Sequence, residues 1–463
     1  MLQEKEKQQL NEQLKNYSDR LRIPGMAIMA HQDGEKVYEY YYGFRDEKEE
    51  LLVNGDTVFG VASITKSFAA LAIMQLQDAG KLSVLDPVQK WLPHFALPND
   101  GASDKVTIHH LMTHTAGLPG MYAVHLARLQ SILDDPDGSY LFAGDHILHK
   151  DPISTVDDMV EIMKNTEVSL LGQPGEMFNY SNEAYALLQT IIEEASGEDF
   201  LTYMDKHVFE PLQMNRSTFL QAKLEEMDNV TEIFAYDKTP ERKVFHSPSW
   251  WDVGEIYTNG SLKASVSDLM NYVDMYVGNG KFQGKTILSK DSVEQMTTPH
   301  VITPNDVEYG YGFIIGEVGG YKTFGHGGGI KGVSSFMLAV PEKKLSIVVL
   351  INIAEAPAEN MALQVMRQLL KLEKEKNDLP TIDVSKEQLE TYCGKYRSQE
   401  GQEVHAEINE EGQLQLLVGV STIPLRPVAD HEFLTQDNKK ITFIVENGKV
   451  KAIFRGLRYI EKE

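Results

Sequence analysis

Strand-like runs lie near both ends of a long first region of the chain, and this placement constrains its fold more than any other feature. Between the two groups of strands, the apolar residues follow helical spacing instead. We therefore expect an α/β unit in which sheet elements from the two ends enclose helices. The expected strands are Met26 to Met29 and Val37 to Tyr42, joined as a hairpin at Asp33-Gly34, and Gly310 to Glu317, Ser334 to Val340 and Leu345 to Asn352.

Three helices can be placed by their apolar periodicity. The first opens at Ser63, carries Phe68, Leu71, Ala72, Met74 and Leu76 on one face, and has Gly80 where a C-terminal cap belongs. The second runs from about Glu183 to Ser196 before Gly197, and the third covers about 358–372. Residues 121–155 are rich in Asp, His and Gly with little periodicity, so we expect a long surface excursion beside an active-site entrance.

The length of 463 residues exceeds what one ordinary core supports, so a second unit is expected. A charged stretch at 373–378, with Pro380 behind it, is typical of a linker. Beyond it, short alternating runs are separated by turn residues, with Asn447-Gly448 as a strong hairpin signal. We predict a main domain over 1–372, a linker over 373–384 and a small all-β unit over 385–463.

Composition excludes several classes of function. Lys plus Arg number 44 against 68 Asp plus Glu, and the net charge of −24 repels phosphate backbones, so no nucleic-acid partner is expected. Cys393 is the single cysteine, which rules out an intramolecular disulfide and is typical of a small core residue. The N-terminal residues lack a signal-peptide core and no apolar run reaches about 18 residues, so we expect no membrane span and a cytoplasmic protein. A secreted chain stripped of its leader would have the same pattern.

Ser63-Ile64-Thr65-Lys66 is the single Ser-x-x-Lys in the chain, and it opens the first helix. Residues three apart share a helix face, so the Lys66 amine can reach the Ser63 hydroxyl. A serine hydroxyl becomes a good nucleophile only when a neighbour takes its proton. The alternative is a helix-capping serine followed by an exposed lysine, and the motif alone does not decide between the two.

Two Tyr-x-Asn triplets are candidates for acid–base work. Tyr180-Ser181-Asn182 follows Gly172-Gln173-Pro174-Gly175 and directly precedes the second helix. There Tyr180 could exchange protons and Asn182 could bind a substrate carbonyl. Tyr257-Thr258-Asn259 is the competing triplet, and either tyrosine could instead be a core residue with a satisfied hydroxyl. We favour Tyr180 because of its Pro-Gly approach and its helix, and we expect Tyr257 near the cleft wall.

A glycine-rich segment, His326-Gly327-Gly328-Gly329, contains a formal G-x-G-x-x-G over 327–332. A strand-like run follows it, not the helix that a dinucleotide site requires, so we reject a nucleotide loop. Consecutive glycines on a strand edge would let a substrate backbone lie along Gly328 and Gly329, with the Gly329 amide facing a developing oxyanion. His326 could supply a polar or positive contact there. A glycine-rich hairpin without chemistry is the alternative.

His109, His110 and His114 lie close together before Thr115-Ala116-Gly117-Leu118-Pro119. They have no carboxylate partner at a recognised metal spacing, and the chain has no metal-binding cysteine cluster. We expect a structural turn there and no metal site in the protein.

The three motifs occur in the order of a known superfamily. Through Ser63-x-x-Lys66, Tyr180-x-Asn182 and His326-Gly327-Gly328 the chain resembles class C β-lactamases, D-alanyl-D-alanine carboxypeptidases and related esterases. The resemblance covers about residues 10–370 and extends through Ile23-Pro24-Gly25, Leu111 to Pro119, Gly260-Ser261-Leu262 and Tyr309-Gly310-Tyr311-Gly312.

The resemblance implies an α/β (α+β) domain with an antiparallel sheet flanked by helices, a helical subdomain, and an active site between them. It implies that Ser63 is acylated, that Lys66 and Tyr180 handle its proton, and that Asn182 orients the substrate amide. The backbone amides of Ser63 and Gly329 would form the oxyanion hole, and no metal or organic cofactor would be needed.

One departure from the family pattern bears on the substrate. Class C β-lactamases typically carry Lys-Thr-Gly on the sheet edge, where this chain has His326-Gly327-Gly328. His-x-Gly resembles D-aminopeptidases and some carboxypeptidases, and the segment around Tyr392 to Tyr396 is similar to their lipocalin-like barrel. We therefore expect a serine hydrolase acting on a small peptide or ester, with a β-lactam as the weaker substrate. A non-catalytic scaffolding member of the superfamily is the alternative from another class, and homo-oligomerisation stays open.

Overall fold

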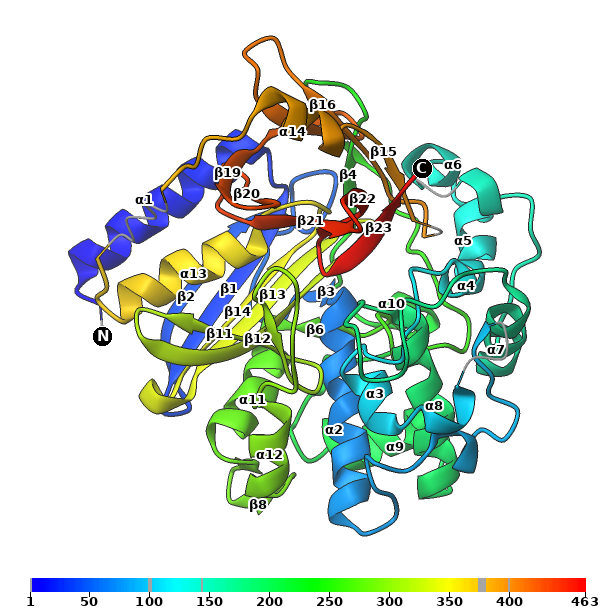
Figure 1. Ribbon diagram of the computed structural model, residues 1–463. Coiled ribbons are helices and arrows are strands. Elements are labelled where there is room, and N and C mark those ends of the chain that lie inside the picture. The colour runs from blue at the N-terminus through cyan, green and yellow to red at the C-terminus, as the bar shows by residue number, and fades with distance from the viewer. Residues whose placement is uncertain (1, 99–101, 143–144, 374–379, 399) are drawn as a thin grey trace.

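The computed structural model in Figure 1 describes residues 2–98, 102–142, 145–373, 380–398 and 400–463. Two large antiparallel sheets organise this part of the chain, one of eight strands and one of nine. Half of the predicted linker, residues 374–379, lies outside the described residues. No helix in the described ranges is both long and apolar enough to cross a bilayer.

The eight-stranded sheet joins strands from both ends of the first region, as expected. Its spatial order is β2-β1-β14-β13-β12-β11-β10-β9, so β1 lies between β2 and β14. The Asp33-Gly34 turn that links β1 to β2 has positive φ at both residues, as a tight hairpin of this kind requires. The strands are β1 (Gly25–Gln32), β2 (Glu35–Gly43), β9 (Val301–Ile302), β10 (Glu308–Tyr309), β11 (Ile314–Val318), β12 (Tyr321–Ile330), β13 (Val333–Val340) and β14 (Leu345–Ile351).

Helices cover both faces of this sheet (Figure 1). On one face, α1 (Glu4–Leu21) and α13 (Ala358–Leu369) pack with Met26 and Ile28 of β1. On the other face, α2 (Thr65–Asp78) and α11 (Val266–Val277) pack with Ala27 and Met29 of the same strand. Successive residues of β1 thus point into two different cores, which explains why the sequence there is continuously apolar.

Smaller elements form the helical region beside the sheet. Within the surface excursion expected at 121–155, the described residues form short helices that bury an apolar cluster, which includes Leu126, Leu129 and Ile132. The remaining helices are α3 (Ile108–Met112), α4 (Ala123–Ala127), α5 (Leu129–Asp134), α6 (Gly138–Leu141), α7 (Val156–Asn165), α8 (Asn182–Ser196), α9 (Phe200–Met204), α10 (Ala222–Glu226) and α12 (Lys290–Met296). Short strand pairs are β3 (Val58–Gly60) with β6 (Lys263–Ser265), β4 (Phe234–Tyr236) with β5 (Val244–His246), and β7 (Lys281–Phe282) with β8 (Lys285–Thr286).

The nine-stranded sheet confirms the predicted C-terminal barrel. Its order is β18-β17-β16-β15-β23-β22-β21-β20-β19, and the two outer strands are consecutive in the chain, separated by Leu425 alone, so the barrel is nearly closed. Helix α14 (Lys386–Tyr392) precedes it. The strands are β15 (Gly394–Arg397), β16 (Glu403–Ile408), β17 (Leu414–Val418), β18 (Ser421–Pro424), β19 (Arg426–Ala429), β20 (Glu432–Leu434), β21 (Lys440–Glu446), β22 (Lys449–Arg455) and β23 (Arg458–Lys462).

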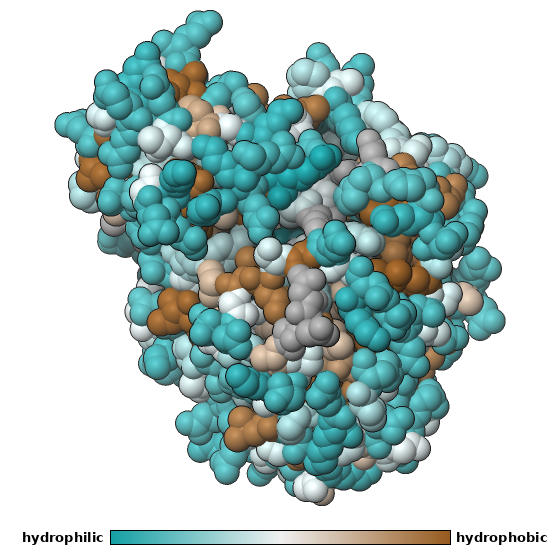
Figure 2. All heavy atoms as spheres, turned by 45° about the vertical axis from the view of Figure 1, so that its right-hand side comes forward, coloured by the Kyte–Doolittle hydropathy of each residue, from teal (hydrophilic) through white to brown (hydrophobic). Residues whose placement is uncertain are grey.

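The barrel packs against the main domain through its last hairpin. Phe454 and Tyr459, from β22 and β23, join Phe178, Tyr180 and Tyr309 in one apolar cluster. The Asn447-Gly448 turn predicted from the sequence joins β21 to β22, with positive φ at both residues. Elsewhere the face drawn in Figure 2 is largely hydrophilic, as the charged composition requires.

Candidate active site

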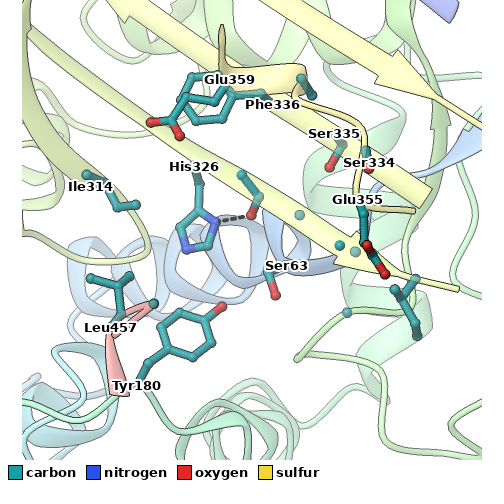
Figure 3. Close-up of a pocket in the computed structure, with 18 of the residues that line it drawn as sticks. Ser63, Tyr180, Ile314, His326, Ser334, Ser335, Phe336, Glu355, Glu359 and Leu457 are labelled. Atoms are coloured by element: carbon teal, nitrogen blue, oxygen red, sulfur yellow. Dashed lines mark hydrogen bonds between the residues drawn. The ribbon is translucent and has the colours of Figure 1, made fainter. Parts of the chain in front are cut away.

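The predicted site residues converge on one cavity of about 640 Å³. Ser63, Tyr180, Asn182 and the segment 326–329 all line it, although they come from distant parts of the chain. Figure 3 shows the Tyr180 hydroxyl directed toward Ser63, with His326 on the strand above them. The cavity also has lining residues that the sequence did not single out, among them Arg128, Leu457 and Arg458.

Ser63 lies in a single 3₁₀ turn, Ala62–Ile64, which leads directly into α2. Ala62 has φ of 47°, a left-handed conformation that an alanine rarely adopts. The preceding Val61 carbonyl accepts a 2.7 Å hydrogen bond from the Ser335 hydroxyl. Gly328 makes this close approach possible, because a Cβ at that position would lie 2.2 Å from the Val61 oxygen. The strained turn is thus held by β12 and β13, and it presents Ser63 to the cavity.

Lys66 is fully buried one helical turn after Ser63. Its Nζ lies 3.3 Å from Ser63 Oγ, 2.9 Å from Asn182 Oδ1 and 2.6 Å from the Asn259 carbonyl oxygen. Burial lowers the pKa of the Lys66 amine well below its usual value, and the nearby Arg458 and Arg128 charges lower it further. An amine in these surroundings loses its proton more easily than a solvent-exposed lysine.

Tyr180 is 5% exposed, and its hydroxyl has no hydrogen-bond partner among the described residues. Burial raises the pKa of this phenol to about 12, although the neighbouring Ser63 hydroxyl and the Arg458 charge pull it downward. The Lys66 Nζ and the Arg458 guanidinium lie 4.9 and 4.8 Å from the ring centroid. At neutral pH Tyr180 is therefore a protonated phenol between two basic groups.

Asn182 is the first residue of α8, which Ser181 caps by accepting a hydrogen bond from the Ala184 amide. The cap fixes where the helix starts and therefore where the Asn182 side chain lies. Its carbonyl oxygen is used by Lys66. This contact leaves the two N–H donors of the Asn182 amide unused by Lys66.

The glycine segment occupies the end of β12 and has one free edge. Strand β11 pairs with β12 only as far as Ile314 opposite Gly325, whereas β13 continues to pair as far as Ile330. Beyond Gly325 the other edge of β12 faces the cavity that Gly327, Gly328 and Gly329 line. This is the free strand edge that the sequence predicted for a substrate backbone.

His326 belongs to a chain of neutral hydrogen bonds. Its Nδ1 lies 2.6 Å from the Gly327 carbonyl oxygen, so Nδ1 carries the proton and Nε2 accepts from the Tyr309 hydroxyl at 3.2 Å. Tyr309 in turn accepts from Nε2 of His114 at 3.2 Å, because His114 Nδ1 accepts from the Ser181 amide. Burial lowers the pKa of His326 to about 4. The contact expected from His326 is therefore polar, and it carries no charge at neutral pH.

The last hairpin of the barrel completes the wall beside Tyr180. Leu457 offers its carbonyl oxygen to the Tyr180 amide at 3.0 Å. Arg458 contacts Glu400 through Nε at 2.6 Å and through a terminal nitrogen at 3.3 Å, and both side chains are largely buried. The sequence analysis did not identify Leu457, Arg458, Glu400 or Arg128, because none of these residues belongs to a recognised motif.

The other candidates lie elsewhere. Tyr257 packs its ring near Phe200 and Phe219, outside the cavity, although Asn259 of the same triplet reaches Lys66. His109 contacts the Tyr311 hydroxyl, at 2.7 Å. No group of three or more His, Cys, Asp or Glu that could hold a metal ion occurs within the ranges that the structure describes.

Known proteins resemble this chain in sequence and in architecture. The family model described as "Beta-lactamase" matches residues 10–371. Penicillin-binding protein 4* of Bacillus subtilis is 26% identical over 425 residues, covering 88% of this chain and 87% of that protein. The solved structure of the octameric penicillin-binding protein homologue from Pyrococcus abyssi superposes with a TM-score of 0.70 and 28% identity, covering 98% of this chain and 99% of that one. A D-stereospecific amidohydrolase from Streptomyces shares the fold, with a TM-score of 0.62 and 22% identity over 80% of this chain and 100% of that one.

Proposed function

The chain belongs to the beta-lactamase family of serine hydrolases, and from this premise we propose that it cleaves amide or ester bonds through an acyl-enzyme on Ser63. The observation that carries the proposal is the set of contacts around Lys66. Asn182 and Asn259 supply two hydrogen-bond acceptors, and Ser63 Oγ is the third neighbour. A neutral amine has two N–H donors and one lone pair, so two acceptors leave the lone pair for the Ser63 proton.

Acylation then proceeds with a defined path for each proton. Ser63 Oγ forms a bond to the substrate carbonyl carbon while its proton passes to Lys66. The developing oxyanion faces the backbone amides of Ser63 and Gly329, the two donors that we propose for the oxyanion hole. When the bond to the leaving group breaks, the leaving nitrogen or oxygen takes the proton of the Tyr180 hydroxyl. The phenolate is stabilised by the Lys66 ammonium and Arg458.

Deacylation restores each group. A water molecule attacks the acyl carbon and gives one proton to the Tyr180 phenolate. The bond to Ser63 Oγ breaks, and this oxygen recovers its proton from the Lys66 ammonium. The resting pKa of Tyr180, about 12, supports this order, because a phenol that is protonated at neutral pH begins the cycle as an acid.

The substrate that we propose is a small peptide or ester, with D-residues favoured. The free edge of β12 can pair with an extended substrate backbone. His326 is neutral where β-lactamases of class C typically carry a lysine, so the strand supplies no fixed cation for a β-lactam carboxylate. The fold shared with a D-stereospecific amidohydrolase supports the D-residue preference. We expect hydrolysis of nitrocefin to be weak or absent.

The test replaces two serines four residues apart, Ser63 in the 3₁₀ turn and Ser67 in α2. Ser63→Ala should abolish covalent labelling by a fluorophosphonate probe, because the nucleophile is gone. Ser67→Ala is the matched control, since Ser67 is fully buried and bonds to the Ile64 carbonyl and Tyr272, outside the cavity. The control should label at the wild-type stoichiometry, with thermal unfolding showing that both variants are folded.

Labelling of Ser63→Ala at full stoichiometry would contradict the proposal. So would a wild-type protein that neither labels nor turns over p-nitrophenyl esters, D-amino-acid anilides or nitrocefin. The second result would favour a non-catalytic scaffolding protein of the same family.

A further inference from the structure

We infer that Arg128 is the residue that recognises a carboxylate group on the substrate of Ser63. The inference deepens the proposed function and rests on it, because it names a chemical group that the hydrolysed molecule must carry. Arg128 connects α4 to α5 in the helical region, and it lines the same cavity as Ser63, Tyr180 and Asn182. No sequence motif includes it.

The Arg128 side chain lacks a partner in the part of the chain that the structure describes. Its Nε is buried without a hydrogen bond, and no carboxylate there lies within ion-pair distance of its guanidinium. Burial lowers the pKa of Arg128 to about 10, so the side chain is still a cation at neutral pH. Arg128 is half-buried, and a partly desolvated cation without a counterion is costly, so proteins keep one mainly where something else supplies the opposite charge.

The other basic groups that line the cavity, and Lys66 next to it, already have partners among the described residues. Arg458 has two contacts with Glu400, and Lys66 has three acceptor contacts. Lys439 Nζ lies 3.5 Å from a carboxylate oxygen of Glu359. His326 donates to a backbone carbonyl and is neutral. Arg128 is therefore the cation that a ligand can pair with without displacing an existing contact among the described residues.

The two carboxylates near Arg128 do not form ion pairs with it. Glu400 is bound by Arg458. Glu183 accepts a hydrogen bond from the Val124 amide, and burial together with the Glu400 charge raises its pKa to about 7, so it is only partly ionised. Both attract Arg128 from beyond contact distance. Arg128 therefore adds an uncompensated positive charge to the cavity lining, in a protein whose net charge is −24.

A carboxylate is the ligand chemistry that fits this position best. The planar guanidinium forms two parallel hydrogen bonds with a carboxylate, and such charge-assisted bonds are about twice as strong as neutral ones. A small peptide offers a carboxylate at its C-terminus or on an acidic side chain. Phosphate is a weaker candidate, because its two negative charges exceed the single positive charge that Arg128 supplies.

The test measures how well small molecules protect Ser63 from the fluorophosphonate probe. N-acetyl-D-alanine is compared with N-acetyl-D-alaninamide, and N-acetyl-D-alanyl-D-alanine with its amide, since each pair differs in one carboxylate. In the wild type we expect the acid of at least one pair to protect at a tenfold lower concentration than its amide. Arg128→Gln should reduce that preference below about threefold, with Arg128→Lys retaining part of it.

Lys439→Gln is the matched control, because it removes one positive charge from the same cavity at a lysine that is already paired. It should keep the wild-type preference for the acid. The inference is overturned if acid and amide protect equally in the wild type, or if the preference survives in Arg128→Gln. Failure of the proposed function is distinguishable, because Ser63 would then not label in the wild type at all.

Discussion

The two Tyr-x-Asn triplets have the same sequence pattern, yet they serve Lys66 in different ways. In the first, Tyr180 lines the cavity and Asn182 offers its side-chain oxygen to Lys66. In the second, the Tyr257 ring packs near Phe200, outside the cavity, and Asn259 offers its main-chain oxygen to the same amine. The comparison shows that a shared spacing can bring two segments to one site without giving their side chains the same role.

The largest difference in acylation rate should be between variants of the two tyrosines. Tyr180→Phe removes the proton donor of the proposed mechanism, so we expect the acylation rate to fall by about 10²–10⁴-fold. Tyr257→Phe should change it by less than about threefold, because that hydroxyl is outside the cavity. Single-turnover acylation with a D-amino-acid p-nitroanilide measures both, because the anilide nitrogen must take up a proton to leave. The reverse ranking would assign the acid–base role to the second triplet.

The next largest difference in acylation rate should be between variants of the two asparagines. Asn182→Ala removes an acceptor that holds Lys66, and we expect acylation to slow by roughly 10- to 100-fold. Asn259→Ala keeps the main-chain oxygen that Lys66 uses, so its rate should stay within about threefold of wild type. Single-turnover rates compare the two variants, and equal losses would show that the Asn259 side chain matters as well.

A smaller effect should follow from the barrel residues behind the first triplet. The Arg458 charge lowers the pKa of Lys66 and the Glu400 charge raises it. Arg458→Gln should therefore move the ascending limb of the acylation pH profile to higher pH, and Glu400→Gln should move it to lower pH.

The double variant, which removes both charges, is the control for that experiment. Its pH profile should lie close to that of the wild type, and it should unfold at a higher temperature than either single variant, because no unpaired buried charge remains. If neither single variant shifts the acylation pH profile, the barrel residues do not affect the pKa of Lys66.

The smallest effect is the pH dependence of folding stability that arises from His326. This residue is connected to the first triplet by hydrogen bonds through Tyr309, His114 and Ser181. The pKa of His326 is about 4 in the folded protein against about 6.5 when unfolded, so the unfolded chain binds more protons between these values. Stability should therefore fall as pH decreases through this window, by about 1 kcal/mol from pH 7 to 5.5. Thermal unfolding of wild type and His326→Gln tests this, and a variant with an equally steep pH dependence would contradict it.

Sequence alone was sufficient for those parts of the molecule that depend on local pattern. Local signals specify three of these elements. Turn residues mark the hairpin at Asp33-Gly34 and the barrel hairpin at Asn447-Gly448, and apolar periodicity marks the helix after Ser63. The motifs also identified Ser63, Tyr180 and the glycine segment as residues of one cavity, because their order in the chain resembles that of a known family.

The rest depends on long-range packing, for which the chain has no local signal. Arg458 reaches Tyr180 only because the barrel docks on the Phe178 cluster, and no motif surrounds it. Arg128 lies in a segment without clear periodicity. His114 was interpreted as part of a structural turn, and its hydrogen bond to Tyr309 requires two loops that are distant in the chain to meet.

The position of β1 between β2 and β14 has a consequence for biosynthesis. A ribosome adds about 5–20 residues per second, so the N-terminal hairpin waits tens of seconds before Leu345–Ile351 emerges to pair with it. During that interval one edge of an apolar strand is open to other nascent chains. We expect general chaperones that bind exposed apolar segments to improve the yield of this protein more than that of a protein whose sheet closes locally.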